Sequence, residues 1–138
     1  MAQSGAIFGG EHSGHFYFAD FWRADSGMLA ALHAIAALGE SEKTLSELLA
    51  PYARYFASGE INSTVSDSKA IMAGIKESYG SKPGVTTDEL DGLTVDGDTW
   101  WFNVRASNTE PLLRLNVEAK TQSQMQALRD EVLAVIRG

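Results

Sequence analysis

Apolar and polar residues alternate near the end of the chain, from Leu113 to Ala119, in a segment that begins at Leu112. A period of two is typical of a β-strand that packs one face against a core and leaves the other face polar. We therefore predict a strand over these eight positions. Its inward face carries Leu113, Leu115, Val117 and Ala119, and its outward face carries Arg114, Asn116 and Glu118.

The spacing of apolar residues changes to that of a helix directly after this strand. Thr121 is placed to cap the helix, with Gln124 at its third position. The apolar stripe consists of Met125, Leu128, Val132 and Val135. Upstream, the same reasoning predicts a strand over 60–64, a helix over 67–79, and strands over 85–95 and 99–104. The second half therefore predicts an α+β unit, in which a largely antiparallel four-stranded sheet carries two helices on one face.

The first half of the chain has a different pattern. Two apolar strands are predicted over 5–10 and 15–22, and two helices over 27–38 and 45–55. Asp25 or Ser26 can cap the first helix, and Thr44 with Glu47 forms a capping box for the second. We interpret this half as the end of an α/β domain. Because the character of the sequence changes near residue 55, we predict two domains, over 1–55 and 56–138.

Composition narrows the class of protein. The chain has 138 residues, of which 44% are hydrophobic, and this is enough for a packed core. It contains no cysteine, which excludes a disulfide framework and a cysteine metal site. The net charge of −7 opposes binding to nucleic acid and to anionic membranes. The sequence has neither a signal peptide nor an apolar run near the ~20 residues of a membrane span, so we expect a cytoplasmic location.

Polar side chains gather in the glycine-rich turn over 9–15, between the first two strands. Glu11 can accept two hydroxyl hydrogen bonds, as the vicinal hydroxyls of a sugar require, and Ser13 can add another. His15 is a candidate for proton exchange with a sugar hydroxyl, because histidine titrates near neutral pH. The same residues would suit a plain polar hairpin. They would also suit a zinc site that includes His12, which is the least favoured alternative.

A second polar loop, over 105–111, joins two predicted strands. Its candidate anion-binding residues are Arg105, Ser107, Asn108 and Thr109, with Arg114 close behind. The fork of an arginine suits phosphate oxygens, and hydroxyls, an amide and successive backbone N–H groups can complete a cradle. The alternative is an ordinary hairpin turn, because serine, asparagine and threonine are common turn formers. We favour the phosphate site, which must then be a local cluster of donors in an acidic chain.

One acidic segment, Asp96-Gly97-Asp98, looks like part of a metal-binding loop. It lies between two predicted strands, however, where Asp-Gly is a strong signal for a hairpin turn. We therefore predict a turn here and assign no metal ligand in this chain.

Together the two loops resemble those of the α-D-phosphohexomutase superfamily. The family's Gly-Glu-x-Ser-Gly-His loop, in its third domain, stands here as Gly10-Glu11-His12-Ser13-Gly14-His15. Its Arg-x-Ser-Asn/Gly-Thr-Glu-Pro loop, in the fourth domain, stands here as Arg105-Ala106-Ser107-Asn108-Thr109-Glu110-Pro111. Asn108 and His12 favour the phosphomannomutase/phosphoglucomutase branch, and a phosphoglucosamine mutase is the alternative. Ala106 departs from the family's frequent proline.

The resemblance implies a mechanism for an intact enzyme. A phosphoserine gives its phosphoryl group to a hexose monophosphate, the bisphosphorylated sugar reorients, and the other phosphate returns to the serine. A Mg²⁺ ion stabilises the transferred group. By the same resemblance, Glu11 and Ser13 hold sugar hydroxyls and His15 transfers a proton. The 105–109 loop, with Arg114, binds the non-reacting phosphate of a mannose or glucose phosphate.

The family's phosphoserine and magnesium loops have no counterpart in this sequence. We therefore expect a fragment that binds phosphosugar, holds no cofactor itself, and lacks mutase activity without the upstream domains of the same enzyme. A stand-alone phosphosugar-binding module is the alternative. The truncated edge near Ile7, Phe8 and 16–21 would expose apolar surface, and self-association through it is a further expectation.

Overall fold

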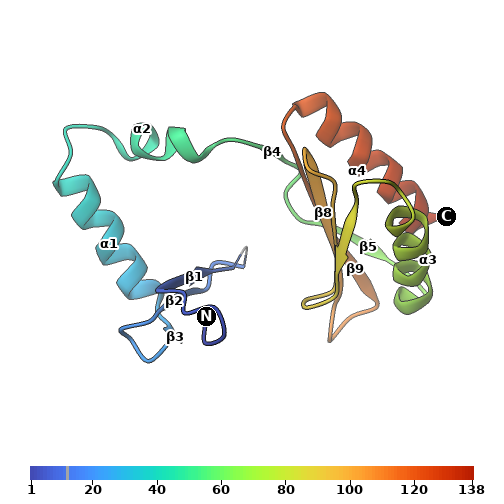
Figure 1. Ribbon diagram of the computed structural model, residues 1–138, viewed down its shortest axis with the longest axis horizontal. Helices are drawn as coiled ribbons and strands as arrows, with labels where there is room; N and C mark the ends of the chain where they lie inside the picture. The colour runs from blue at the N-terminus through green and yellow to red at the C-terminus, as the bar shows by residue number, and fades with distance from the viewer. Residues whose placement is uncertain (12) are drawn as a thin grey trace. The chain divides into compact units, whose positions relative to one another are not determined.

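The computed structural model describes residues 1–11 and 13–138. These residues form two compact units, Met1–Tyr52 and Ala53–Gly138 (Figure 1). Among the described residues, no helix combines the length and the apolar character that crossing a bilayer would require.

The second unit is built on one antiparallel sheet. Its strands are β4 (Phe56–Ala57), β5 (Ile61–Thr64), β6 (Thr86–Asp88), β7 (Leu93–Asp96), β8 (Trp100–Ala106) and β9 (Leu112–Ala119). They lie in the order β4-β9-β8-β7-β6, and β5 pairs with β9 as well. All of these ladders are antiparallel. The predicted α+β class is therefore confirmed, but the sheet has six strands where we predicted four.

Two local features account for the extra strands. The predicted strand over 85–95 divides into β6 and β7 because the chain turns between them. In that turn the N–H of Leu90 donates to the Asp88 carboxylate at 2.8 Å, and Gly92 has a φ of +73°. A non-glycine residue rarely adopts this left-handed conformation. The other addition is β4, in which Phe56 pairs with Ala119 at the end of β9.

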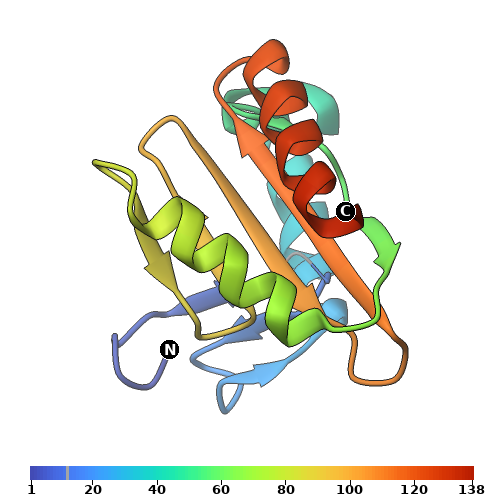
Figure 2. The same ribbon diagram turned by 90° about the vertical axis from the view of Figure 1, so that its right-hand side faces the viewer.

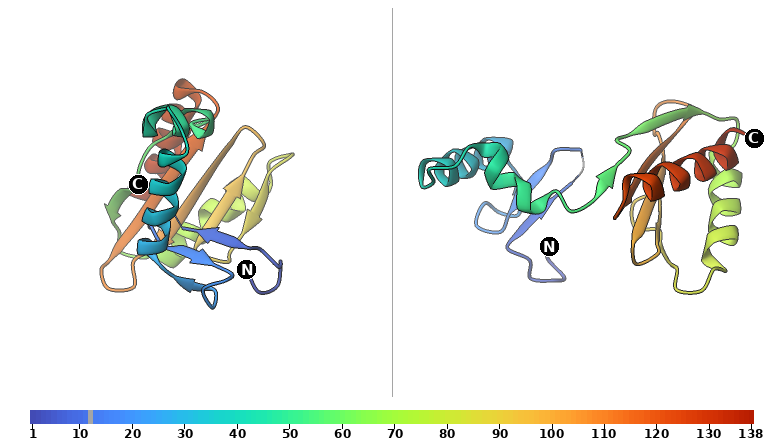
Figure 3. Two further views of the ribbon diagram at one scale, coloured as in Figure 1. Left: turned by 90° about the vertical axis from the view of Figure 1, so that its left-hand side faces the viewer. Right: turned by 90° about the horizontal axis from the view of Figure 1, so that it is seen from above.

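Two helices cover one face of this sheet, α3 (Ser68–Gly80) and α4 (Gln122–Arg137), and Figures 2 and 3 show both on the same side. Asp67 caps α3 by accepting from the N–H of Ala70 at 2.9 Å. The predicted cap of α4 is confirmed, since the Thr121 hydroxyl accepts from the N–H of Gln124 at 3.2 Å. Both caps satisfy backbone donors that the first helical turn leaves unpaired.

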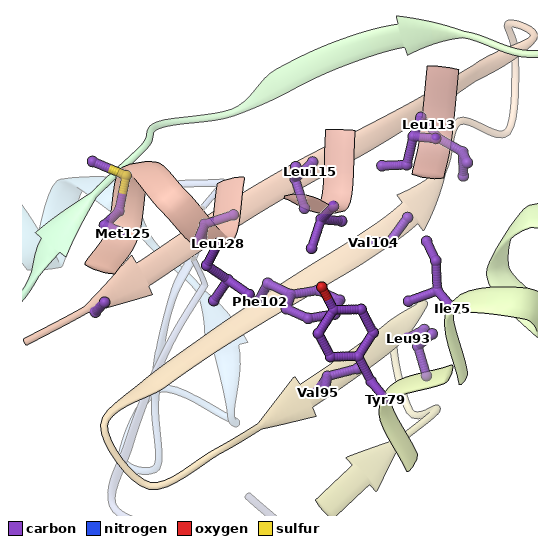
Figure 4. Packing of buried hydrophobic residues seen from close by; sticks show 14 residues of the cluster. Ile75, Tyr79, Leu93, Val95, Phe102, Val104, Leu113, Leu115, Met125 and Leu128 are labelled. Atoms are coloured by element: carbon purple, nitrogen blue, oxygen red, sulfur yellow. The ribbon is translucent and has the colours of Figure 1, made fainter. Parts of the chain in front are cut away.

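The core of the second unit lies between the sheet and these helices (Figure 4). The sheet contributes the alternate residues Leu93, Val95, Phe102, Val104, Leu113, Leu115, Val117 and Ala119. The helices contribute Ile75, Tyr79, Met125, Leu128, Val132 and Ile136. The predicted inward face of β9 is therefore confirmed. Our stripe for α4 was wrong at its end, because Val135 is 46% exposed and Ile136 is buried in its place.

The segment Asp96-Gly97-Asp98 joins β7 to β8, as predicted for a hairpin turn. The N–H of Gly97 donates to the carbonyl of Trp100 at 2.9 Å, which closes the connection. Strand β8 then places Trp101, Asn103 and Arg105 on the face of the sheet opposite the core. This polar face carries the second candidate loop at one end.

The first unit contains a three-stranded antiparallel sheet and two helices. Its strands are β1 (Phe8–Gly10), β2 (Phe16–Phe18) and β3 (Ala24–Asp25), in the order β1-β2-β3. Helix α1 (Gly27–Gly39) is capped by Ser26, whose hydroxyl accepts from the N–H of Leu29 at 3.2 Å. Helix α2 (Leu45–Leu49) has the predicted capping box, and the 3-10 turn η1 (Ala50–Tyr52) follows it.

Three of our predicted elements in this unit are too long. The strand predicted over 5–10 begins only at Phe8, because the chain turns before it and Gly5 has a φ of +66°. The strand predicted over 15–22 ends at Phe18, because the chain then turns through Trp22 and Arg23, with φ of 52° and 55°. The helix predicted over 45–55 ends at Leu49, and Pro51 follows. Proline has no N–H to donate to the preceding turn and its ring crowds that turn, so the α-helix stops there.

Candidate functional site

The 105–111 segment is a tight connection between β8 and β9. Ala106 pairs with Leu113, and the N–H of Ser107 donates to the carbonyl of Leu112 at 2.9 Å. Within the loop, the hydroxyls of Ser107 and Thr109 lie 3.5 Å apart, and the N–H of Thr109 donates to the Ser107 hydroxyl at 3.4 Å. The strands thus hold two hydroxyl groups side by side, and Asn108 lies exposed between them.

Two arginines lie beside this loop. Arg105 and Arg114 are direct cross-strand partners in the β8–β9 ladder, on the face away from the core. Both line a hollow of about 490 Å³, together with Ser107, Asn108 and Thr109. Two like charges at opposed positions repel each other, and a bound anion relieves that repulsion. The arrangement therefore favours a small, multiply charged anion such as a phosphate.

Each arginine has one carboxylate within reach. Arg105 donates from Nη1 to Oδ2 of Asp91 at 3.0 Å. Arg114 lies farther from its partner, with Nε 3.9 Å from Oε1 of Glu60. In the described part of the chain, the buried Nε of Arg114 makes no hydrogen bond. Since a guanidinium carries five N–H donors, both side chains retain donors for an incoming anion.

The glycine-rich turn lies between β1 and β2 in the first unit. The N–H of Glu11 donates to the carbonyl of His15 at 2.9 Å, and the N–H of Gly14 donates to the backbone carbonyl of Glu11 at 3.0 Å. Two side chains orient the Glu11 carboxylate. Tyr17 donates to Oε1 at 2.5 Å, and Ser13 donates to Oε2 at 3.0 Å. These two hydrogen bonds fix the orientation of the Glu11 carboxylate, the group that the sequence predicts to bind a hydroxylated ligand. The pKa of Tyr17 is raised, chiefly by this hydrogen bond to Glu11.

His15 forms a close pair with Asp25. Its Nδ1 lies 2.7 Å from Oδ2 of Asp25, and Oδ1 of the same carboxylate accepts from the N–H of Phe16 at 2.9 Å. These two hydrogen bonds lower the pKa of Asp25, so it is a carboxylate and Nδ1 is the donor. In neutral His15, the other ring nitrogen, Nε2, therefore carries the lone pair that can accept a proton.

The pairing shifts the pKa values of His15 and Asp25 in opposite directions. The hydrogen bond to Asp25, and then the charge of Asp25, raise the pKa of His15 from its ordinary 6.5. The contribution of His15 to the stability of the folded state is therefore complete below pH 6.5, and it is lost as the pH rises through the raised pKa. The pKa of Asp25 is lowered from 3.8, so its stabilisation is present above that value and is lost as pH falls through the lowered pKa.

The structure gathers the predicted phosphate-binding residues around one hollow and the predicted sugar-binding residues in one turn. His12, which supports the branch assignment and the zinc alternative, lies outside the described residues. Four side chains that lie against the predicted ones were missed: Tyr17, Asp25, Glu60 and Asp91. The sequence did contain a signal for Tyr17, because it lies two positions after His15, and residues two apart in an extended strand lie on the same face. Asp25 was considered only as a helix cap.

Among residues 1–11 and 13–138, no three histidine, aspartate or glutamate side chains are grouped so that they could hold an ion. These residues therefore do not fit a magnesium site.

Comparison with known proteins shows the family of both units. Residues 1–55 match the family model of phosphoglucomutase/phosphomannomutase, alpha/beta/alpha domain III, and residues 60–135 match that of the phosphoglucomutase/phosphomannomutase C-terminal domain. The chain therefore belongs to the phosphoglucomutase/phosphomannomutase family.

Two curated relatives are similar to nearly the whole of this chain. It is 42% identical over 136 residues to a phosphomannomutase of Methanocaldococcus jannaschii, covering 99% of this chain and 30% of the relative. It is 40% identical over 140 residues to a protein of Xanthomonas campestris pv. campestris described as phosphohexose mutases, covering 100% of this chain and 31% of the relative. The chain thus spans about a third of the length of these curated relatives.

The fold has a counterpart among solved structures. A crystal structure of a phosphoglucomutase/phosphomannomutase family protein from Burkholderia thailandensis matches 99% of this chain and 29% of its own, with a TM-score of 0.75 and 23% identity. At this level of identity, the likeness supports the fold.

Proposed function

We propose that this chain is the substrate-binding part of a phosphohexomutase that interconverts hexose 1-phosphate and hexose 6-phosphate through a bisphosphorylated sugar. The observation that carries the proposal is the pair of cross-strand arginines beside a loop of hydroxyl donors. Family membership, and the phosphomannomutase and phosphohexose mutase relatives, supply the reaction class. Mannose and glucose phosphates are the proposed substrates.

In this proposal the 105–109 loop holds the phosphate that is not reacting. Arg105 and Arg114 supply charge-assisted hydrogen bonds, and Ser107, Asn108 and Thr109 supply neutral donors. This task needs fixed donors and no nucleophile, which fits a loop anchored by two strands. One cradle would have to accept a phosphate from either end of the sugar, because both phosphates take the non-reacting role in turn.

In the same proposal the glycine-rich turn reads the sugar. Glu11 and Ser13 bind hydroxyl groups, and Tyr17 keeps the Glu11 carboxylate in place. His15, oriented by Asp25, accepts or donates a proton at Nε2. The phosphoserine and the magnesium ion that complete the chemistry would belong to other parts of the enzyme, so these 138 residues alone would be inactive. We place that enzyme in the cytoplasm.

The exposed surface of the first unit supports a further proposal, about what covers this unit in the intact enzyme. Large apolar side chains of this unit stand in solvent, among them Ile7, Met28 and Ile35, which are 82%, 75% and 65% exposed. Exposed apolar area of this kind marks a surface that another structure covers. We propose that the remainder of the α/β/α domain covers it in the intact enzyme, and that copies of this chain associate through it when it is produced alone.

The phosphate proposal is tested by an amide NMR titration of the 138-residue chain with glucose 1-phosphate. We expect saturable shifts at residues 107–109, with a dissociation constant of about 1 mM. They should vanish in Arg105→Ala and persist in Arg129→Ala, which removes the same charge from α4, where Arg129 is paired with Asp130. Equal binding by both variants would refute the proposed role of the loop.

A further inference from the structure

A turn between β6 and β7 brings one carboxylate into the hollow of the phosphate loop. Asp91 lines this hollow with Arg105, and its Oδ2 lies 3.0 Å from Nη1 of Arg105. No sequence motif marked Asp91 as part of a site. An acidic side chain is unexpected among the donors of an anion site, because it repels the anion that the site binds.

The fold holds this turn closely against the strand that bears Arg105. A Cβ atom on Gly92 would lie 2.5 Å from the carbonyl oxygen of Val104 and 3.0 Å from Cα of Arg105. On the neighbouring side, Nδ2 of Asn103 donates to the backbone carbonyl of Asp91 at 2.9 Å. The backbone of Asp91 is therefore fixed by contacts that do not involve its carboxylate, and the carboxylate is free to serve the site.

The two members of the ion pair differ in exposure. The Asp91 side chain is 72% exposed, whereas that of Arg105 is 35% exposed. An exposed ion pair is worth little in water, so the carboxylate can leave the guanidinium at small cost. Arg105 lies on β8, in the middle of the sheet, and its side chain is the more buried of the two. An anion that arrives at the hollow can thus take the place of the carboxylate on Nη1.

We propose that Asp91 is a built-in counter-ion of the phosphate site, which occupies Arg105 when the site is empty and weakens its hold on phosphate when the site is filled. The inference rests on the proposed function of the loop. A mutase must release one phosphate of its bisphosphorylated intermediate and take up the other. A site with uncompensated arginines would bind each phosphate more tightly and slow that exchange.

The test is a titration of the 138-residue chain with inorganic phosphate, followed by the amides of residues 107–109. Asp91→Asn removes the charge but keeps the size of the side chain. We expect it to bind phosphate about threefold to tenfold more tightly, which one unit charge a few ångström from a phosphate produces at water-like screening. Asp91→Ala removes the same charge and should behave alike.

Glu89→Gln is the matched control. Glu89 lies two residues away, pairs with Lys76 and is 61% exposed, so its loss changes the net charge equally without touching Arg105. Tighter binding in the Asp91 variants and little change in Glu89→Gln would support the inference. Equal effects of all three, or weaker binding in Asp91→Asn, would overturn it while leaving the phosphate site intact. If wild type and Arg105→Ala respond alike to phosphate, the proposed function fails, and the inference with it.

Discussion

Gly92 offers a sharp test of the packing that positions Arg105. Its φ of +73° lies in the left-handed region, which costs an alanine about 1–2 kcal/mol relative to glycine. An alanine Cβ would also meet the Val104 carbonyl oxygen at 2.5 Å. This oxygen and Cα of Arg105, which the Cβ would meet at 3.0 Å, are both backbone atoms and cannot move aside as the end of a flexible side chain can. Overpacking of this kind costs about 1–3 kcal/mol. We therefore expect Gly92→Ala to lower the free energy of unfolding of the second unit by about 2–5 kcal/mol.

The control is Gly84→Ala, because Gly84 has a φ of +76° and no heavy atom within 4 Å of an added Cβ. It carries the conformational cost without the contact. Urea unfolding followed through the amide resonances of Phe102 and Val117, which are buried in the second unit, measures both variants. An equal loss in the two would show that the close approach of Gly92 to β8 contributes nothing and would refute the reasoning.

Three further outcomes are expected. In an imidazole NMR titration, Asp25→Asn should bring the pKa of His15 down toward its ordinary 6.5, because Asp25 is the largest cause of the raised value; an unchanged midpoint would contradict the pairing. Tyr79→Phe should cost about 1 kcal/mol of unfolding free energy in urea, because the buried hydroxyl donates to Glu131 at 2.8 Å, and a neutral effect would count against that bond. Leu32→Glu, on the exposed apolar side of α1, should reduce concentration-dependent association in sedimentation, whereas a wild-type chain that is monomeric at all concentrations would exclude this surface as an interface.

The sequence predicted the second unit well where one periodicity ran without interruption. In β9 the alternation from Leu113 to Ala119 settles which side chains face the core, because a slip of one residue would bury Arg114. Helical phase was less certain at the end of α4. Val135 and Ile136 are adjacent, and only the packing of the helix on the sheet decides which of them is buried.

Local periodicity was insufficient where the backbone departs from common conformations. Trp22 and Arg23 adopt left-handed φ values, which neither residue type favours, so the early end of β2 had no signal in the sequence. The Asp-Gly pair at Gly92, in contrast, was an available signal for a turn and was absorbed into one long predicted strand.

The candidate site divides in the same way. Motif residues were found because their types and order are recognisable. Their supporting partners were not, because these come from other strands. Asp91 precedes Arg105 by fourteen positions and reaches it only through the pairing of Leu93 with Val104. Asp25 reaches His15 only through the pairing of β2 with β3. Such partners follow from register, which the sequence of either strand alone does not specify.

The central claim is that one cradle holds the non-reacting phosphate from either end of a hexose. The most direct measurement compares amide shifts of the 138-residue chain on titration with glucose 1-phosphate and with glucose 6-phosphate, with glucose as the uncharged control. We expect saturable shifts at residues 105–109 with both phosphates, similar in pattern, and none there with glucose. Shifts in this loop with only one of the two phosphates, or equal shifts with glucose, would contradict it.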